Sequence, residues 1–285
     1  MPTELPEREN AYFIDAESAA EMARLMHQDR LLTKGMGGLF PEQFDISKTH
    51  DILDIACGPG GWVLDVAYAY PKIQVTGIDI SKLVIEYARA QAKVQWLNNA
   101  HFQTIDVLKP LEFPDNSFDF INTRFLFGFM SKEAWPRLMQ ECLRILRPGG
   151  TLRLTECESP LSNSFASERL YGMISQALHA AGRSFSPDGR HVGITPVIGR
   201  FLQNAGYQNI QKKAHILDCS VGMEAHSSFY QDFQAGLKLL QPFLVKMKTT
   251  TDEEFEALYE QALADMHSED FCAVWFYLSA WGVKG

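Results

Sequence analysis

The sequence has no long hydrophobic run, no paired cysteines and no excess of positive charge. None of its apolar stretches reaches the roughly 18 residues that a membrane-spanning helix needs. Its first residues, MPTELPEREN, have neither the basic start nor the apolar centre of a secretion signal. We therefore expect a cytoplasmic protein with no membrane partner. The cysteines are odd in number and widely spaced, which argues against a disulfide framework; they are Cys57, Cys142, Cys157, Cys219 and Cys272.

Metal-binding patterns are also missing, and this absence narrows the chemistry. No two cysteines stand as C-x-x-C and no two histidines as H-x-x-x-H, the spacings that hold zinc. We expect no metal ion. Acidic residues outnumber basic ones by 35 to 26, which gives a formal net charge of -9. Such a surface repels a phosphate backbone, so we expect no nucleic-acid partner.

A regular alternation of short apolar runs and amphipathic stretches begins at His50. This alternation is typical of βα units that build a parallel sheet, and we predict a doubly wound α/β fold. The last strand follows a long helical excursion and is expected to return as an antiparallel partner. With 285 residues, 46% of them hydrophobic, the chain can form one large domain with a helical cap. The seven expected strands are residues 51–56, 73–79, 101–106, 118–124, 151–156, 208–217 and 271–281.

The strongest local signal is the segment ILDIACGPGGW at residues 52–62. It reads as a buried strand, a glycine turn and the start of a helix. Gly58 and Gly60 permit positive φ and let a ligand approach the backbone closely, while the helix N-terminus offers free N–H groups. A nucleotide-like ligand fits such a turn. The alternative is a tight strand-to-helix turn that binds nothing.

Two acidic residues close the next two predicted strands. Asp79 stands 21 residues after Gly58, where a Rossmann-like sheet places a carboxylate on the ribose hydroxyls. Asp106 closes the third strand. Position 63 is Val63, so the dinucleotide fingerprint G-x-G-x-x-G is incomplete, and no G-K-[ST] segment is present to bind a triphosphate. The pattern therefore favours a nucleoside ligand over NAD or ATP.

Five segments stand in order between residues 50 and 156: DIACGPGG at 54–61, GIDIS at 77–81, DV at 106–107, FDFINTR at 118–124 and LRPGG at 146–150. Together they resemble the motifs of class I S-adenosylmethionine-dependent methyltransferases, of the small-molecule type with a helical lid. The resemblance implies a Rossmann-like, mostly parallel seven-stranded sheet with an antiparallel last strand. It is specific for fold and cofactor and says nothing about the substrate.

The resemblance also implies where the cofactor would lie. Asp79 would hold the ribose and Ile80 would pack on the adenine. Asp106 would accept a hydrogen bond from the adenine amino group, with Val107 beside it. The family often has glycine where this chain has alanine at position 56. The methionine half and the sulfonium would face Asp54, Ala56, Cys57, Gly58, Gly60, Thr123, Arg124 and Phe125.

Residues 10–15 and 30–38 resemble the lid of these enzymes. The resemblance implies that Tyr12 and Arg30 close over the methionine carboxylate; an ordinary packed helix with a surface arginine is the alternative. We predict an N-terminal helical lid at residues 1–49 and a methyltransferase core at residues 50–285. Cap insertions are expected at about residues 157–195 and 220–268.

The function that the resemblance implies is transfer of a methyl group from S-adenosylmethionine to an O-, N- or C-nucleophile of a small molecule, leaving S-adenosylhomocysteine. Alignment of the reactants can supply about 7–11 kcal/mol of such an in-line displacement. A general base is available among His179, His191, His226 and Tyr230, each of which is otherwise a structural or surface residue. An apolar or aromatic substrate is expected to stack among Phe125, Leu126, Phe127, Phe129, Phe165, Tyr171, Phe229, Tyr230 and Phe233.

Several alternatives stay open. The chain could bind S-adenosylmethionine without methyl transfer or use it in another rearrangement. A protein methyltransferase is a second alternative, which would need an open groove. An NAD-dependent oxidoreductase is disfavoured by Val63. Monomer and homodimer are both compatible with the sequence.

Overall fold

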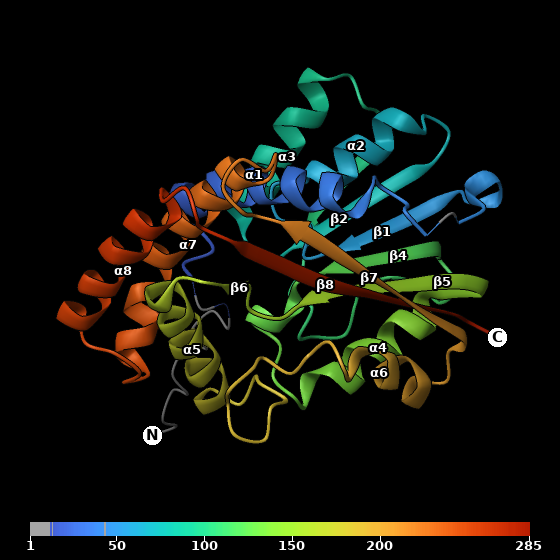
Figure 1. Ribbon diagram of the computed structural model, residues 1–285. Helices are drawn as coiled ribbons and strands as arrows, with labels where there is room; N and C mark the ends of the chain where they lie inside the picture. The colour runs from blue at the N-terminus through green and yellow to red at the C-terminus, as the bar shows by residue number, and fades with distance from the viewer. Residues whose placement is uncertain (1–11, 13, 43) are drawn as a thin grey trace, which may run out of the picture.

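One β-sheet forms the centre of the protein in the computed structural model, which describes residues 12, 14–42 and 44–285 (Figure 1). The described strands lie in the order β3-β2-β1-β4-β5-β8-β6. Strand β7 pairs with the edge of β8 that lies opposite β5. Their bounds are β1 Asp51–Ile55, β2 Gln74–Asp79, β3 Ala100–Thr104, β4 Phe118–Arg124, β5 Leu146–Cys157, β6 Leu161–Ser162, β7 Gln208–Asp218 and β8 Ala273–Val283.

The predicted doubly wound sheet is confirmed, with one addition. Strands β1 to β5 are parallel to one another, whereas β8 runs antiparallel to both β5 and β7. We predicted seven strands, and the structure adds β6, which pairs Leu161 with Val274 and Ser162 with Ala273. A pairing of two residues is too short to show an alternating pattern in the sequence.

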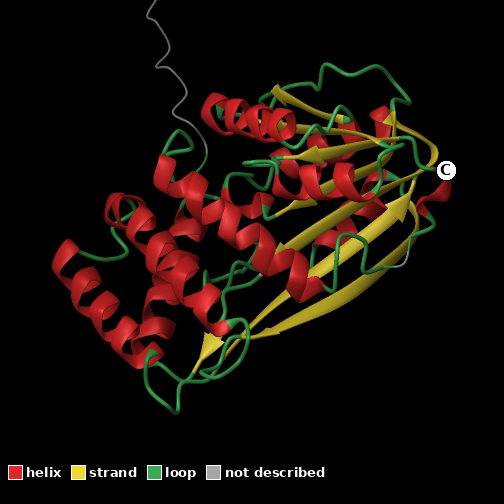
Figure 2. Ribbon diagram, turned by 90° about the horizontal axis from the view of Figure 1, so that it is seen from above, coloured by secondary structure: helices red, strands yellow, loops and turns green. Residues whose placement is uncertain are grey.

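Helices cover both faces of the sheet and extend past one of its ends (Figure 2). In Figure 1, α1, α2 and α3 lie over one face, α4 and α6 over the other, and α5, α7 and α8 form a separate group at one end. Two short 3₁₀ helices, Ile46–Lys48 and Leu126–Gly128, complete the elements. The helices are α1 Ala19–Met36, α2 Gly61–Ala69, α3 Lys82–Val94, α4 Ala134–Ile145, α5 Phe165–Ala180, α6 Ile198–Ala205, α7 His226–Lys246 and α8 Asp252–Met266.

Local sequence signals explain why the elements begin and end where they do. Strand β1 is buried on both faces, since Ile52 and Leu53 are both inaccessible to solvent, as expected for the middle of a parallel sheet. The Ser81 hydroxyl accepts from the amide of Val84 and begins α3. Gly37, at φ 90°, ends α1. These signals place both helices next to the carboxyl ends of the parallel strands.

The group of α5, α7 and α8 shares its hydrophobic core with α1 and with the start of β8. Helix α5 falls within residues 157–195, and α7 and α8 fall within residues 220–268; the assignment of these segments to a cap stays a prediction. Helix α1 packs on α7, so the N-terminal segment and the cap meet. The lid at residues 1–49 stays a prediction, and residues 1–11, 13 and 43 of that segment are outside the described part.

Candidate functional site

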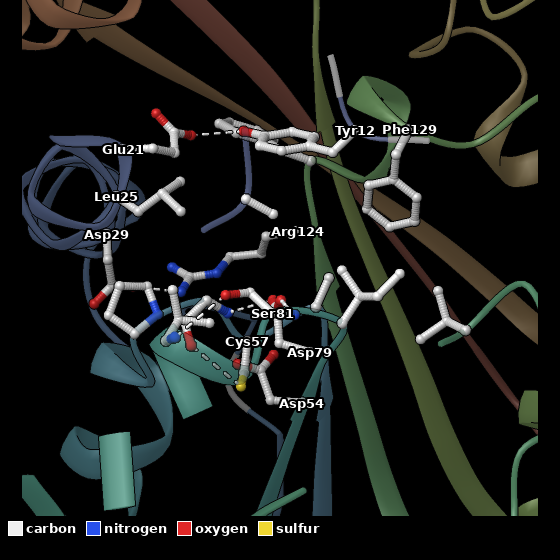
Figure 3. A pocket seen from close by; sticks show the side chains of 18 of the residues that line it. Tyr12, Glu21, Leu25, Asp29, Asp54, Cys57, Asp79, Ser81, Arg124 and Phe129 are labelled. Atoms are coloured by element: carbon white, nitrogen blue, oxygen red, sulfur yellow. Dashed lines mark hydrogen bonds and ion pairs between the residues drawn. The ribbon is translucent and has the colours of Figure 1, made fainter. Parts of the chain in front are cut away.

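Two adjoining cavities lie at the carboxyl ends of the parallel strands. The first is bounded by the ends of β1, β2 and β4, the loop after β3, and α1 (Figure 3). It holds about 1230 Å³ of space, counting its open mouth. All but three of the residues predicted to bind the cofactor line it: Tyr12, Asp54, Ala56, Cys57, Gly58, Asp79, Ile80, Asp106, Val107, Arg124 and Phe125.

The glycine turn and Asp79 form one hydrogen-bonded unit at the edge of this cavity. One carboxylate oxygen of Asp79 accepts from the amide of Gly58 at 3.0 Å, and the other accepts from the amide of Ser81 at 3.0 Å. Each oxygen keeps a lone pair for a ligand hydroxyl. Gly58 has φ 53°, and a Cβ there would contact only Leu25, at 3.7 Å. The turn is therefore held in shape and stays open to a ligand.

Asp54 lies at the base of the same cavity and is buried. Its Oδ1 accepts from the side-chain amide of Asn122 at 2.7 Å, and the Asn122 carbonyl accepts from Nε of Arg153 at 2.9 Å. Burial raises the pKa of Asp54 to about 7, although Arg124 and the Asn122 hydrogen bond lower it. Burial also raises the pKa of Asp79. Both carboxylates would gain by contact with a cationic ligand group.

Arg124 at the end of β4 connects the sheet to α1. Its guanidinium forms an ion pair with Asp29 and donates to the hydroxyl of Thr33 at 3.1 Å. Burial opposes its charge, but Asp29 and Asp54 raise the pKa of Arg124. Figure 3 shows Arg124 extending toward Asp29.

Arg30, which we expected at the cavity, is exposed and does not line it. The physical reason is the helical turn of about 100° per residue, which points Asp29 inward and its successor outward. We therefore do not propose Arg30 as a ligand of the cofactor.

A polar network on α1 separates the two cavities. The Tyr12 hydroxyl donates to Glu21 at 2.7 Å, and Glu21 accepts two hydrogen bonds of 2.7 Å from Arg24. Arg24 also donates to Asp232 of α7 at 2.7 Å. The sequence motifs do not point to Glu21, Arg24 or Asp232. The spacing of three residues between Glu21 and Arg24 was a readable signal, but nothing local links them to Asp232.

Two further predicted cofactor residues and one predicted strand end lie differently from our expectation. Gly60 faces the core, where a Cβ would come within 2.5 Å of the Phe102 ring. Thr123 is buried and its hydroxyl has no partner in the described part of the chain. Asp106 does not close a strand: β3 ends at Thr104, and the Asp106 carboxylate accepts from the amide of Leu108 at 3.0 Å. It still lines the first cavity.

The second cavity adjoins the first and shares Tyr12, Gln28 and Phe125 with it. Many of its walls are aromatic, contributed by the loop after β4, by α5 and α7, and by β8. Phe129 lines the first cavity, whereas Phe165 is exposed and Leu126 lies in the core. The aromatic residues in the walls of the second cavity are Tyr12, Phe125, Phe127, Tyr171, Phe229, Phe233 and Trp275.

None of the four candidate general bases lines either cavity as the structure describes them. His191 is exposed. Nδ1 of His226 lies 3.0 Å from the carbonyl of Cys219. The ring of Tyr230 lies 4.7 Å from that of His267. Nδ1 of His179 is buried and has no partner among the described residues. We therefore do not propose them as bases.

Metal clusters and membrane-spanning helices were sought among the described residues. No three His, Cys, Asp or Glu side chains among residues 12, 14–42 and 44–285 are grouped to hold a metal ion. Within the same residues, no helix has the length and apolar content required to cross a bilayer.

The glycine turn and its neighbouring strands are similar to known proteins. Residues 52–150 match the family described as a methyltransferase domain. Methyltransferase pytC from Aspergillus terreus is 32% identical over 171 residues, covering 56% of this chain and 47% of that protein. The demethylmenaquinone methyltransferase of Listeria welshimeri is 30% identical over 116 residues, covering 40% of this chain and 48% of that enzyme. The alignments thus span about half the length of these relatives.

Solved structures show the same fold. The YcgJ protein of Bacillus subtilis has a TM-score of 0.53 and 17% identity, over 88% of this chain and 99% of its own. A second structure is phosphoethanolamine N-methyltransferase 2 of Haemonchus contortus, in complex with phosphomonomethylethanolamine and S-adenosylhomocysteine. Its TM-score is 0.52 and its identity 18%, and the match covers 88% of this chain and 52% of that one. The sheet order agrees with the family match: residues 52–150 are similar to a methyltransferase domain and lie in a sheet of the same fold.

Proposed function

We propose that the protein transfers a methyl group from S-adenosylmethionine to a small-molecule acceptor by in-line displacement. The observation that carries this proposal is the meeting of two cavities at Phe125, one with the polar groups that a nucleoside needs and one with mainly apolar walls. Bound in the first cavity, S-adenosylmethionine would supply an activated methyl group on its sulfonium. The task left to the protein is to hold and align the acceptor.

The residues of the first cavity fit this cofactor. Asp79 has two carboxylate oxygens, each with a lone pair left over, for the two ribose hydroxyls. Ile80 and Val107 offer apolar surface for the adenine, and Asp106 an acceptor for its amino group. Asp54 would face the cationic methionyl end. Thr123 and Gly60 would support these groups from the core.

Phe125 has a backbone that matches a position between two ligands. Its φ of 57° is in the left-handed region, which is uncommon for a bulky residue. The amide of Phe125 donates to the carbonyl of Thr155 at 2.9 Å and holds this conformation. The ring then packs 5.6 Å from that of Trp275, centre to centre, and lines both cavities. Strain retained at such a position is typical of functional sites.

Exclusion of water is the second contribution of the protein. Helix α1 covers the first cavity and is tied to the sheet by Asp29–Arg124 and to α7 by Arg24–Asp232. A covered site favours a small acceptor over a side chain on a protein partner, which would need an open groove. Because the four candidate bases lie elsewhere, the proposal relies on alignment, which can supply about 7–11 kcal/mol.

The decisive experiment is a calorimetric titration of S-adenosylmethionine into wild-type protein and Asp79→Ala. We expect the substitution to weaken binding at least about tenfold, a loss of about 1.4 kcal/mol, because the ribose hydroxyls lose their acceptor. Glu112→Ala, which removes an exposed carboxylate, serves as the control and should bind like wild type. Absence of binding to folded wild-type protein would overturn the proposal. Formation of S-adenosylhomocysteine with an acceptor library then separates an enzyme from a binding protein.

The affinity for S-adenosylmethionine is expected to rise with pH up to about pH 7. The pKa of Asp54 is about 7 in the free protein, and a cationic ligand beside it favours the ionised form. Binding therefore requires loss of a proton below pH 7, and affinity should rise by up to about tenfold per pH unit there and level off above.

Dissociation constants measured at pH 6, 7 and 8 test this expectation. Asp54→Asn should flatten the profile, and any pH dependence left in it belongs to Asp79, whose pKa burial also raises. An unchanged constant from pH 6 to 8 in wild-type protein would show that Asp54 does not face the cationic end.

A further inference from the structure

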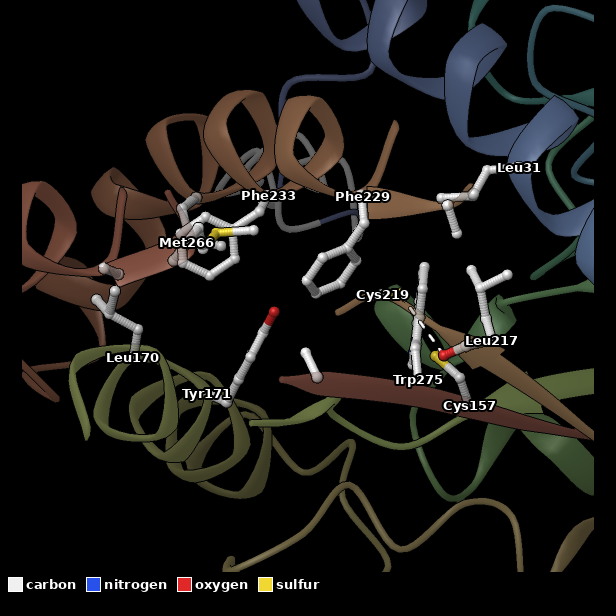
Figure 4. Packing of buried hydrophobic residues seen from close by; sticks show 14 of the residues in the cluster. Leu31, Cys157, Leu170, Tyr171, Leu217, Cys219, Phe229, Phe233, Met266 and Trp275 are labelled. Carbon is white, nitrogen blue, oxygen red and sulfur yellow. Dashed lines mark hydrogen bonds between the residues drawn. The ribbon is translucent and has the colours of Figure 1, made fainter. Parts of the chain in front are cut away.

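The second cavity is the part of the molecule whose chemistry the proposed function leaves undefined. It holds about 860 Å³ of space, counting its open mouth. Figure 4 shows Phe229 of α7, Tyr171 of α5 and Trp275 of β8 around the same space. Rings of this kind bind flat apolar molecules by stacking and edge contacts. The walls therefore favour a ligand with one or two rings.

The charges in these walls disfavour an anion. Arg24 is the cation among the described lining residues, and its guanidinium is already paired: Nε and Nη2 donate to Glu21 and Nη1 to Asp232. Two carboxylates, Asp232 and Glu158, also line the cavity. Glu158 is engaged by the amides of Gly193 and Thr195, at 2.8 and 3.1 Å. A negatively charged ligand would find no free positive charge and two negative ones.

Two polar groups in this cavity have unused hydrogen-bonding capacity. The Tyr171 hydroxyl makes no hydrogen bond within the described part of the chain, and in Figure 4 it points from α5 toward Phe229. The second carboxylate oxygen of Asp232 accepts only a long hydrogen bond, 3.3 Å, from Gln28. Burial and then Asp232 raise the pKa of Tyr171, so its hydroxyl stays protonated. Together they can hold one hydroxyl, Tyr171 donating and Asp232 accepting.

We propose that the second cavity binds an uncharged, ring-sized apolar acceptor whose hydroxyl is held by Tyr171 and Asp232, and that it rejects carboxylate and phosphate analogues. This inference rests on the proposed function for its meaning, since the acceptor is the molecule to be methylated. Its binding chemistry can be tested without turnover. Tyr171 and Asp232 are then the residues that determine acceptor specificity.

The test compares two probes of the same size, 2-naphthol and 2-naphthoate, by calorimetry at pH 7 with and without S-adenosylhomocysteine. We expect wild-type protein to bind the neutral phenol at least about tenfold more tightly than the anion. Tyr171→Phe should weaken 2-naphthol roughly three- to tenfold, the effect of one neutral hydrogen bond, and leave naphthalene unchanged. Tyr230→Phe, on α7 but outside both cavities, should bind all three probes like wild type.

A second variant tests the charge argument separately. Asp232→Asn leaves one Arg24 nitrogen without its carboxylate partner and removes a negative charge, so the preference for 2-naphthol over 2-naphthoate should shrink. Equal binding of the two probes by wild-type protein, or a Tyr171→Phe variant unchanged toward 2-naphthol, would overturn the inference. If the phenol is preferred but S-adenosylhomocysteine does not bind, the inference stands and the proposed function fails. If S-adenosylhomocysteine binds but the protein does not prefer the phenol, the inference fails and the proposed function stands.

Discussion

Replacement of Arg153 by methionine is expected to lower the free energy of unfolding by about 3–5 kcal/mol. Arg153 and Glu42 form an ion pair at 2.9 Å whose side chains are 1% and 0% exposed. Removing one partner leaves the other buried without its counter-charge. Burial lowers the pKa of Arg153 even beside Glu42, which shows how costly it is to hold this charge in the core. Urea denaturation followed by circular dichroism measures the loss.

Two further variants make this result specific to the pair. Arg153→Met combined with Glu42→Leu should recover much of the stability, because a buried ion pair can be replaced by apolar groups at little net cost. Arg169→Met removes an exposed arginine, paired with Glu254 at 3.4 Å, and should cost less than about 1 kcal/mol. A loss in Arg153→Met as small as that of Arg169→Met would contradict the argument.

The free energy of unfolding is expected to fall as pH rises from about 5 to 8, mainly because of Glu156. Burial raises the pKa of Glu156 from 4.5 to about 8, against the amides of Leu126 and Phe127 that donate to its carboxylate. A carboxyl with a raised pKa in the folded state stabilises the fold when protonated, and this contribution is lost as pH climbs toward 8. At about 1.4 kcal/mol per pKa unit, the loss reaches up to about 4 kcal/mol.

Urea denaturation at pH 5.5, 7 and 8, compared with Glu156→Gln, measures this contribution. Asp54, with a pKa of about 7, adds to the pH dependence of the free energy of unfolding below pH 7. The interval from pH 7 to 8 therefore reports mainly on Glu156. The glutamine variant should lose the slope there, whatever its baseline stability. Glu112→Gln, which changes an exposed carboxyl, should keep the wild-type slope. Stability that is flat or rising between pH 7 and 8 would show that Glu156 is not held protonated.

The first cavity could be predicted from the sequence because its parts are local. A strand, a glycine turn and a helix start within eleven residues fix where Gly58 lies, and the sheet then brings Asp79 beside it. The motifs at residues 54–61 and 118–124 predict that Asp54 and Arg124 lie at the same cavity. Arg30 does not line the first cavity, whereas Asp29 does. The sequence predicts the helix, but it does not show which side of the helix faces the cavity.

The second cavity could not be predicted in the same way. Arg24 and Asp232 are 208 residues apart, and α1 and α7 bring them together only through tertiary packing. The histidines have side chains that can act as bases, yet none of His179, His191 and His226 lines either cavity. Tyr171 and Phe229 were anticipated as members of an aromatic cluster, but no pattern in the sequence showed which members face the cavity.

The place of β8 in the sheet also bears on how the protein folds. This strand lies between β5 and β7, yet it follows both in the chain, and Thr151 of β5 pairs with Val283. Until residues 273–283 have been synthesised, β5 and β7 each keep an unpaired edge, and the cap helices have no strand to close their core. Such long-range pairing slows folding. The edge of β5 therefore stays open while residues 158–272 are made, and the edge of β7 while residues 219–272 are made.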